Sequence, residues 1–169
     1  MTKRHALPVA AGLAAAVLAL TSTSQAEAAS ALRHKNSRSG YCLGMHSSRS
    51  TINLMGCGSS RTYWKSYAAT YVGGKKYVKL KSTRNGKCLG VAGQSTAGGA
   101  ALAWGNCTST RDHSQLWRVH YVRGGNYLII NAHSGKCVGT RGSSTAKGTL
   151  VVQGRCNSAT GSTQLWKRL

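Results

Sequence analysis

Acidic side chains are almost absent from this chain: its 169 residues include 2 acidic and 23 basic ones. The acids are Glu27 and Asp112. Hydrolysis of a glycosidic bond usually requires two carboxylates. A catalytic triad would have to use Asp112 with its neighbours His113 and Ser114, and adjacent residues rarely face one another productively. The sequence therefore predicts a protein that is not an enzyme.

Proline, metal-ligand spacing and helical periodicity are also missing. The only proline is Pro8, and no linker or low-complexity tract interrupts the chain after it. No Cys-x-x-Cys or His-x-x-x-His pair is present, so we expect neither a metal nor another cofactor. No segment shows the 3.6-residue period of a helix over a useful length. One all-β domain is expected.

The N-terminal segment resembles an export signal. Basic Lys3 and Arg4 precede an apolar stretch over 9–20, and Ala26-Glu27-Ala28 provides a small-residue cleavage site. Twelve apolar residues are too few for a membrane-spanning helix, which needs about 20. We expect a signal peptide over 1–28 and a secreted domain over 29–169.

All six cysteines recur at equivalent places in three sequence repeats. The first cysteines of the repeats, in Gly40-Tyr41-Cys42, Gly86-Lys87-Cys88 and Gly135-Lys136-Cys137, are 46 and 49 residues apart. Cysteines of an exported protein are expected to form disulfides. The repeat selects three pairs, one within each copy: Cys42–Cys57, Cys88–Cys107 and Cys137–Cys156.

Each repeat contains about four short strands separated by glycine-rich turns. Residues 127–131 form a β-branched run that ends at a turn, and their counterparts are 32–36 and 78–82. Twelve strands in three copies predict a β-trefoil, with repeats over approximately 30–74, 75–125 and 126–169. We expect a structural core that includes five residues near the end of the copies, the two glutamines binding backbone turns: Trp64, Trp117, Trp166, Gln115 and Gln164.

These repeats resemble the ricin-B-type lectins, the β-trefoil modules with Gln-x-Trp repeats that some bacteria secrete. The resemblance covers about 31–169 and rests on the order and spacing of several motifs. They are Gly86-Lys87-Cys88-Leu89, Ser95-Thr96-Ala97-Gly98-Gly99, Ser144-Thr145-Ala146-Lys147-Gly148, Gln115-Leu116-Trp117 and Gln164-Leu165-Trp166. The resemblance implies one shallow sugar pocket for each repeat.

The sequence departs from the family where sugar is usually held. An aspartate that commonly follows the first cysteine by two positions is replaced by Gly44, Gly90 and Gly139. In the first copy, Thr62 also replaces the glutamine. Missing carboxylates beside many cations would suit a negatively charged ligand, so we expect a preference for acidic or cell-surface glycans.

Six residues in the second and third copies are candidates for ligand binding: Trp104, Asn106, His113, Arg141, Gln153 and Arg155. Trp104 offers a flat apolar face, although core packing is the alternative role for this residue. Arginine binds carboxylate, sulfate or phosphate through two parallel hydrogen bonds. The alternative for the third copy is a solvated rim of unrelated cations.

Positive charge dominates the domain, which has 21 basic side chains and one acid once Lys3, Arg4 and Glu27 are set aside. The charge either keeps the protein soluble or attracts a polyanion. Its densest run is a basic stripe that we expect to act in steering or docking: Lys75, Lys76, Lys79, Lys81, Arg84 and Lys87.

The sequence therefore predicts a secreted carbohydrate-binding protein that favours acidic glycans. Two alternatives remain open at this point. The first is a cationic binder of nucleic acid, anionic wall polymer or lipid, without true sugar specificity. The second is a protein-binding or inhibitory trefoil that acts through a loop. Competition by a defined saccharide separates the first two functions, because a salt-dependent polyanion binder is not displaced by sugar.

Overall fold

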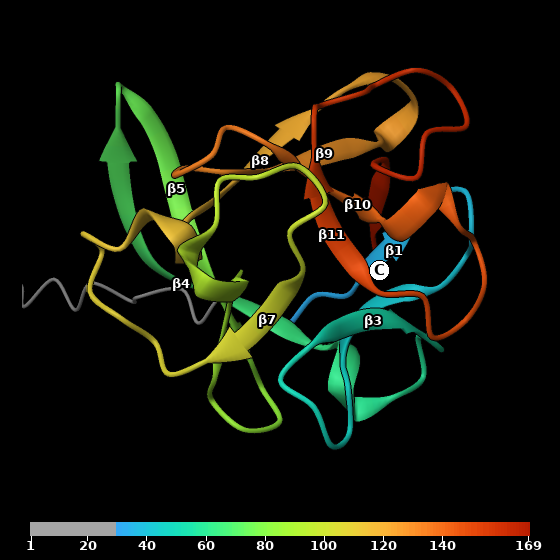
Figure 1. Ribbon diagram of the computed structural model, residues 1–169, viewed down its shortest axis with the longest axis horizontal. Coiled ribbons are helices and arrows are strands. Elements are labelled where there is room, and N and C mark those ends of the chain that lie inside the picture. Colours follow the sequence, from blue (N-terminus) through green and yellow to red (C-terminus); the bar gives the residue numbers. More distant parts are fainter. Residues whose placement is uncertain (1–29) are drawn as a thin grey trace, which may run out of the picture.

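The computed structural model describes residues 30–169, so the predicted signal peptide, 1–28, lies outside the described residues (Figure 1). The described chain forms twelve strands and five short 3-10 helices, with no α-helix between residues 30 and 169. The strands are β1 (His34–Asn36), β2 (Cys42–Met45), β3 (Ile52–Met55), β4 (Trp64–Val72), β5 (Lys75–Ser82), β6 (Cys88–Val91), β7 (Leu102–Gly105), β8 (Trp117–Tyr121), β9 (Tyr127–Asn131), β10 (Cys137–Thr140), β11 (Val151–Gly154) and β12 (Trp166–Arg168). The 3-10 helices are η1 (Ser60–Thr62), η2 (Ala92–Gln94), η3 (His113–Gln115), η4 (Arg123–Gly125) and η5 (Arg141–Ser143).

Six of the strands form a closed barrel. Antiparallel pairing runs from β1 through β12, β9, β8 and β5 to β4. A bridge between Leu32 and Trp64 then joins β4 to the start of the first repeat, with N–H···O distances of 2.8 and 2.9 Å. Closure leaves no long unpaired edge in the barrel wall.

The other six strands form three hairpins that cover one end of the barrel. These hairpins are β2–β3, β6–β7 and β10–β11. Single bridges join them to one another: Thr51 to Ala103, Asn53 to Leu150 and Ala101 to Val152. Three hairpins on a six-stranded barrel make the predicted β-trefoil, and the predicted number of strands is confirmed.

The core lies where the barrel and the hairpins meet, and the three repeats contribute equivalent groups to it. Trp64, Trp117 and Trp166 are at most 1% exposed. Their indole N–H groups donate to the carbonyls of Leu43, Leu89 and Val138, at 3.0, 2.9 and 3.0 Å. Each tryptophan therefore ties its barrel strand to the hairpin of its own repeat, while burying a large apolar ring without an unsatisfied donor.

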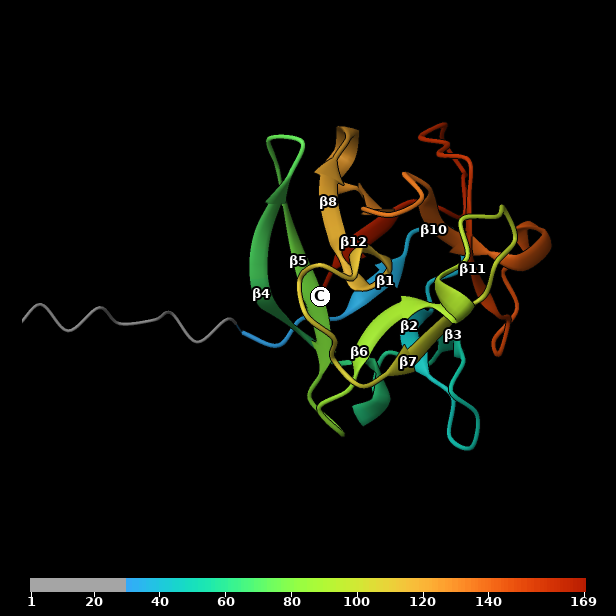
Figure 2. The ribbon, with the colours of Figure 1, turned by 60° about the vertical axis from the view of Figure 1, so that its left-hand side comes forward.

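Each hairpin is fastened by one disulfide to the loop that follows it. The bonds are Cys42–Cys57, Cys88–Cys107 and Cys137–Cys156, and no described cysteine is free. They enclose sequence separations of 15, 19 and 19 residues. Closing a loop of this size stabilises the fold by roughly 3 kcal/mol, chiefly by restricting the unfolded chain. The strands β4 and β5 are longer than the other barrel strands, and the far end of their hairpin extends beyond the barrel beside β8 (Figures 1 and 2).

Candidate functional site

The second repeat has a small open hollow between its hairpin and the loop that leads to β8. It is lined by β6 with η2, by β7 and by η3, and its volume is about 230 Å³. That volume is below the roughly 300 Å³ at which pockets for drug-sized ligands begin. We call it the Trp104 hollow, lined by Gly90, Val91, Ala92, Gly93, Gln94, Ala103, Trp104, Gly105, Thr108, Asp112, Ser114 and Gln115.

Trp104 forms an aromatic wall of this hollow. Its ring is partly buried, because one side packs against the core, and β7 holds its backbone opposite Leu89 of β6. The indole N–H donates to the carbonyl of Arg49 in the first repeat, at 3.2 Å. Trp104 therefore has the core packing considered for it and also borders the hollow.

Asp112 brings a carboxylate into the Trp104 hollow, which corrects the expectation of a pocket without an acid. It caps η3, and its Oδ1 accepts from the N–H of Ser114 at 3.0 Å and from the Ser114 hydroxyl at 2.6 Å. Burial acts to raise the pKa of Asp112, but hydrogen bonds from Ser114 and Thr108 and the charge of Lys79 outweigh it and lower the pKa. The side chain is thus ionised at neutral pH, and it keeps acceptor capacity for a ligand.

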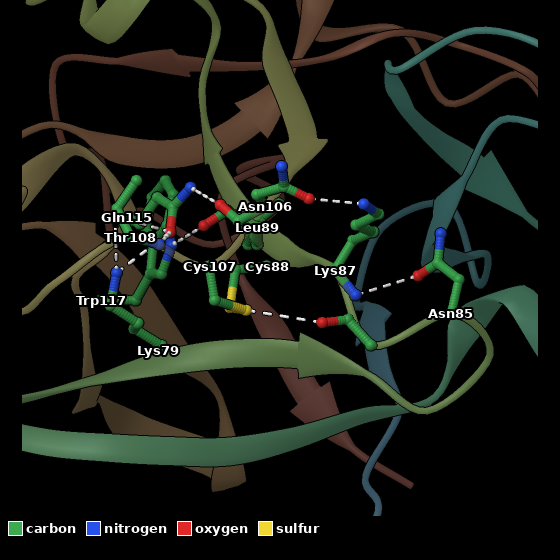
Figure 3. The surroundings of a disulfide bond; sticks show 11 residues. Lys79, Asn85, Lys87, Cys88, Leu89, Asn106, Cys107, Thr108, Gln115 and Trp117 are labelled. Carbon is green, nitrogen blue, oxygen red and sulfur yellow. Dashed lines mark hydrogen bonds between the residues drawn. A yellow bond between two sulfur atoms is a disulfide. The ribbon is translucent and has the colours of Figure 1, made fainter.

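Gln115 lines the Trp104 hollow and serves as a scaffold. Figure 3 shows its side chain beside Thr108 and Lys79. Its amide donates to the carbonyl of Asn106 at 2.8 Å. Its Oε1 accepts from the Thr108 backbone N–H at 3.1 Å, the Thr108 hydroxyl at 3.0 Å and the Lys79 ammonium at 3.0 Å. These bonds fix the loop over 106–115, and with it the position of Asp112.

Lys79 is not part of an exposed basic stripe, contrary to the sequence prediction. Its side chain is 0% exposed, and its Nζ donates to the Thr108 hydroxyl at 2.9 Å as well as to Gln115. The loop over 106–115 covers this face of β5, so alternation along the strand does not place Lys79 in solvent. Burial lowers the pKa of Lys79, opposed by attraction to Asp112. Of the other predicted stripe residues, Lys81 and Lys87 are partly buried, whereas three are exposed: Lys75, Lys76 and Arg84.

Asn106 and His113 do not join Trp104 around one hollow. Asn106 is exposed outside the Trp104 hollow, and its Oδ1 accepts a hydrogen bond from Lys87 (Figure 3). His113 borders an adjoining depression with His133 and Arg111. The site residue that the sequence analysis missed is Asp112. Its position three residues before Gln115, as the only acid of the domain, is the signal that would have identified it.

The third repeat has an equivalent hollow, most of whose residues lie 49 positions further along the chain. Its volume is about 270 Å³. Here Gln153 replaces Trp104, Arg155 replaces Asn106, and Gly161 stands at the position of Asp112. We call it the Arg155 hollow, lined by Gly99, Gly139, Thr140, Ser143, Val152, Gln153, Gly154, Arg155, Asn157, Ser162, Thr163 and Gln164.

Gln153 is a structural residue and not the ligand contact that was predicted. It is 0% exposed, and its amide donates to the carbonyls of Ser95 and Ala97 at 2.8 and 3.0 Å. Its Oε1 accepts from the Ser134 hydroxyl at 2.7 Å. Because these bonds use the side chain to join the second and third repeats, little capacity remains for a ligand. Arg155 and Arg141 are exposed, and only Arg155 lines the hollow.

The glycines at the usual aspartate positions are required by close packing. A Cβ atom on Gly139 would lie 2.7 Å from Cγ of Gln164, and one on Gly90 would lie 3.0 Å from Cγ of Gln115. The glutamine side chains therefore occupy the space that a side chain at Gly90 or Gly139 would enter. In the second repeat, Asp112 brings a carboxylate to the hollow from η3.

In the first repeat, the corresponding space is filled by methionine. A Cβ atom on Gly44 would lie 2.7 Å from Sδ of Met55. Thr62, which replaces the glutamine, donates its hydroxyl to the Ser59 carbonyl at 2.7 Å and so stabilises the end of η1. The first repeat thus has neither the aromatic wall nor the carboxylate of the second.

Backbone strain marks the same rim position in the second and third repeats. Gln94 and Ser143 end η2 and η5 with φ values of 55° and 56°, a conformation that non-glycine residues seldom adopt. Such strain, of order 1–3 kcal/mol, persists where the surrounding structure enforces it and is common at functional sites. Gln94 lines the Trp104 hollow together with Asp112.

The chain belongs to the ricin-type β-trefoil lectin domain-like family, which it matches over residues 62–119 and 113–168. No curated protein matches it in sequence. Within residues 30–169, no three His, Cys, Asp or Glu side chains are grouped to hold a metal ion, and no helix is long and apolar enough to span a membrane.

Solved structures share the fold. The designed threefold-symmetric protein ThreeFoil is 24% identical to this chain, with a TM-score of 0.71. The match covers 82% of this chain and 97% of ThreeFoil. The ricin B-like lectin of Macrolepiota procera, solved in complex with lactose, is 17% identical with a TM-score of 0.64, over 85% and 97%. An exo-β-1,3-galactanase from Clostridium thermocellum is 26% identical with a TM-score of 0.71, and this chain covers 30% of it.

Proposed function

We propose that this protein binds carbohydrate without catalysis and that the Trp104 hollow holds one sugar ring. Membership of the lectin-like family supports carbohydrate binding in general. The observation that supports this hollow in particular is the presence of Trp104 and the carboxylate of Asp112 at the same small opening. An aromatic face and a fixed acceptor match the two sides of a sugar, its C–H face and its hydroxyl groups.

Binding at this hollow needs little rearrangement. Core packing fixes Trp104, and the capping bonds to Ser114 fix Asp112. Hydrogen bonds to a charged group contribute about 1.5–3 kcal/mol each. Preorganised side chains lose little entropy when the ligand binds. A sugar with neighbouring hydroxyls that reach Asp112 and Gln94 while its ring covers Trp104 is the ligand that fits best.

We further propose that the protein is exported and that its charge favours acidic or cell-surface glycans. The domain has a net charge of +20, since its 21 basic side chains face one acid. A charge of this size steers the protein towards negatively charged surfaces. The Trp104 hollow itself contains a carboxylate, so the ring that enters it is neutral, and acidic groups of the same glycan lie outside it.

Replacing Asp112 with asparagine tests this function most sharply. Asparagine is also a good N-cap, so the variant keeps η3 while removing the charge that accepts sugar hydroxyls. We expect Asp112→Asn to weaken neutral saccharide binding about tenfold, and Trp104→Ala to weaken it at least as much. Glycan arrays at two ionic strengths, followed by calorimetry with the best saccharide, measure both effects.

The same variant distinguishes the alternative function of a polyanion binder. Asp112→Asn makes the protein more positive, so a purely electrostatic binder would hold anionic polymers equally well or more tightly. Unchanged saccharide affinity in Asp112→Asn, with thermal unfolding showing an intact fold, would contradict the proposed site. Arg111→Gln changes an exposed neighbouring charge and is the matched control.

A further inference from the structure

A further hollow, lined by residues of all three repeats, gathers three cations. Arg38 comes from the turn after β1, Arg123 from η4 and Lys167 from β12. Together with loop residues over 158–162 they border a space of about 220 Å³ that we call the Arg123 hollow. Asp112, the one carboxylate side chain of the described residues, does not line it.

Hydrogen bonds hold two of these cations in place. Arg38 donates from Nη1 to the carbonyl of Gly161 at 2.9 Å, and Arg123 donates from Nη2 to the hydroxyl of Thr160 at 2.8 Å. Both acceptors belong to the loop before β12. A guanidinium group has five N–H donors, so each arginine keeps donors for a ligand after making its bond.

The floor of the Arg123 hollow is apolar. Leu165 is 6% exposed and packs with Leu128 and Ile130, and Val122 lies partly buried against the same cluster. The three cations are themselves exposed, so water screens their attraction for an anion, and the apolar floor excludes water only from the inner side of the hollow. Their mutual repulsion within the hollow is relieved when an anion binds between them.

We propose that the Arg123 hollow binds an oxyanion, namely the sulfate, phosphate or carboxylate group of a ligand. Arginine matches the paired oxygens of such groups, and Lys167 adds a compact charge. This site is separate from the Trp104 hollow and does not depend on sugar binding there. It borders the Arg155 hollow, with which it shares Ser162.

Sulfate titration at constant ionic strength tests the proposal directly. Chloride is replaced by inorganic sulfate while nitrogen–proton NMR follows the Arg side-chain Nε–H signals and the amide of Gly161. We expect saturable shifts at Arg38, Arg123 and Gly161, and an affinity about tenfold lower in both Arg123→Gln and Lys167→Gln. Retained dispersion of the tryptophan indole signals shows that each variant is folded.

Arg84→Gln is the matched control. Arg84 stands 46 residues after Arg38, at the equivalent place following β5, and it is exposed, donating to the Ser60 hydroxyl at 3.0 Å. The control should bind sulfate within twofold of the parent protein. Equal weakening in all three variants, or shifts that rise without saturation at every arginine, would overturn the proposal.

Two further arms identify the source of the anion and separate this site from the proposed sugar site. A sulfated disaccharide that binds at least tenfold more tightly than both inorganic sulfate and its unsulfated form assigns the hollow to a glycan substituent. Equal affinity for sulfate and the sulfated disaccharide assigns it to a free anion. The Trp104→Ala variant must bind sulfate as tightly as the parent protein. Weaker sulfate binding in this variant would contradict two separate sites.

Discussion

Gly139→Asp, which restores the residue common in the family, should lower the free energy of unfolding by about 3 kcal/mol. The new Cβ would lie 2.7 Å from Cγ of Gln164, and overpacking of a filled interior typically costs 1–3 kcal/mol. The carboxylate would also be buried without a partner, which adds to that cost. Urea unfolding followed by tryptophan fluorescence measures the loss.

Two comparisons show whether the clash with Gln164 is the cause. Gly105 also lies in a hairpin strand, but a Cβ there would have no heavy atom within 4 Å, so Gly105→Asp should cost well under 1 kcal/mol. Gly139→Ala and Gln164→Ala combined should cost less than the sum of their separate effects, because removing Gln164 makes room for the new methyl group. A strictly additive pair would contradict this explanation.

Stability should fall by up to about 3 kcal/mol as the pH falls from 6.5 to 4, because of buried His34. Desolvation, and then the charge of Arg168, lowers the pKa of His34 to about 4 from its ordinary 6.5. Between these pH values the unfolded chain takes up a proton that the folded protein does not, so unfolding becomes easier. The contribution of His34 to stability is complete above pH 6.5, and it does not change further below pH 4.

The environment of His34 explains its resistance to protonation. It is 3% exposed, its Nδ1 lies 2.6 Å from the Tyr127 hydroxyl, and the two rings meet edge to face. Urea unfolding at several pH values gives the free energy of unfolding as a function of pH. Between pH 6.5 and 4, this dependence should be flatter in His34→Gln than in the parent protein. The exposed residue His120 supplies the control, since His120→Gln should keep the slope of the parent protein. Equal slopes in all three proteins would show that His34 is not responsible.

The fold could be predicted from sequence because three aligned copies carry redundant information. Cysteine spacing alone allows many pairings, but Cys42, Cys88 and Cys137 occupy equivalent positions, and that equivalence selects one bond for each copy. Short runs such as 127–131 indicate strands, and the repeat fixes how many there are. The bridge between Leu32 and Trp64 that closes the barrel could not be predicted in this way. The two residues are 32 positions apart, and neither has a sequence feature that indicates its partner.

The candidate site was harder to predict because its contacts join residues that are far apart in sequence. Nothing in the sequence marks Gln153 as bonded to the loop over 95–97, which belongs to another repeat. Strand alternation predicts an exposed Lys79, but the loop that carries Thr108 covers it. Comparison of the repeats identifies Gly44, Gly90 and Gly139, which recur in all three copies. It does not identify Asp112, because this carboxylate occurs in one copy only.

An amide and indole NMR map with a neutral saccharide tests sugar binding at the Trp104 hollow most directly. We expect the largest shifts at the Trp104 indole and at the backbone amides of Gln94 and Ser114. In Asp112→Asn, the same saccharide concentration should cause little shift. Strong shifts confined to other surfaces, or shifts in the second repeat that persist unchanged in Asp112→Asn, would contradict sugar binding at the Trp104 hollow.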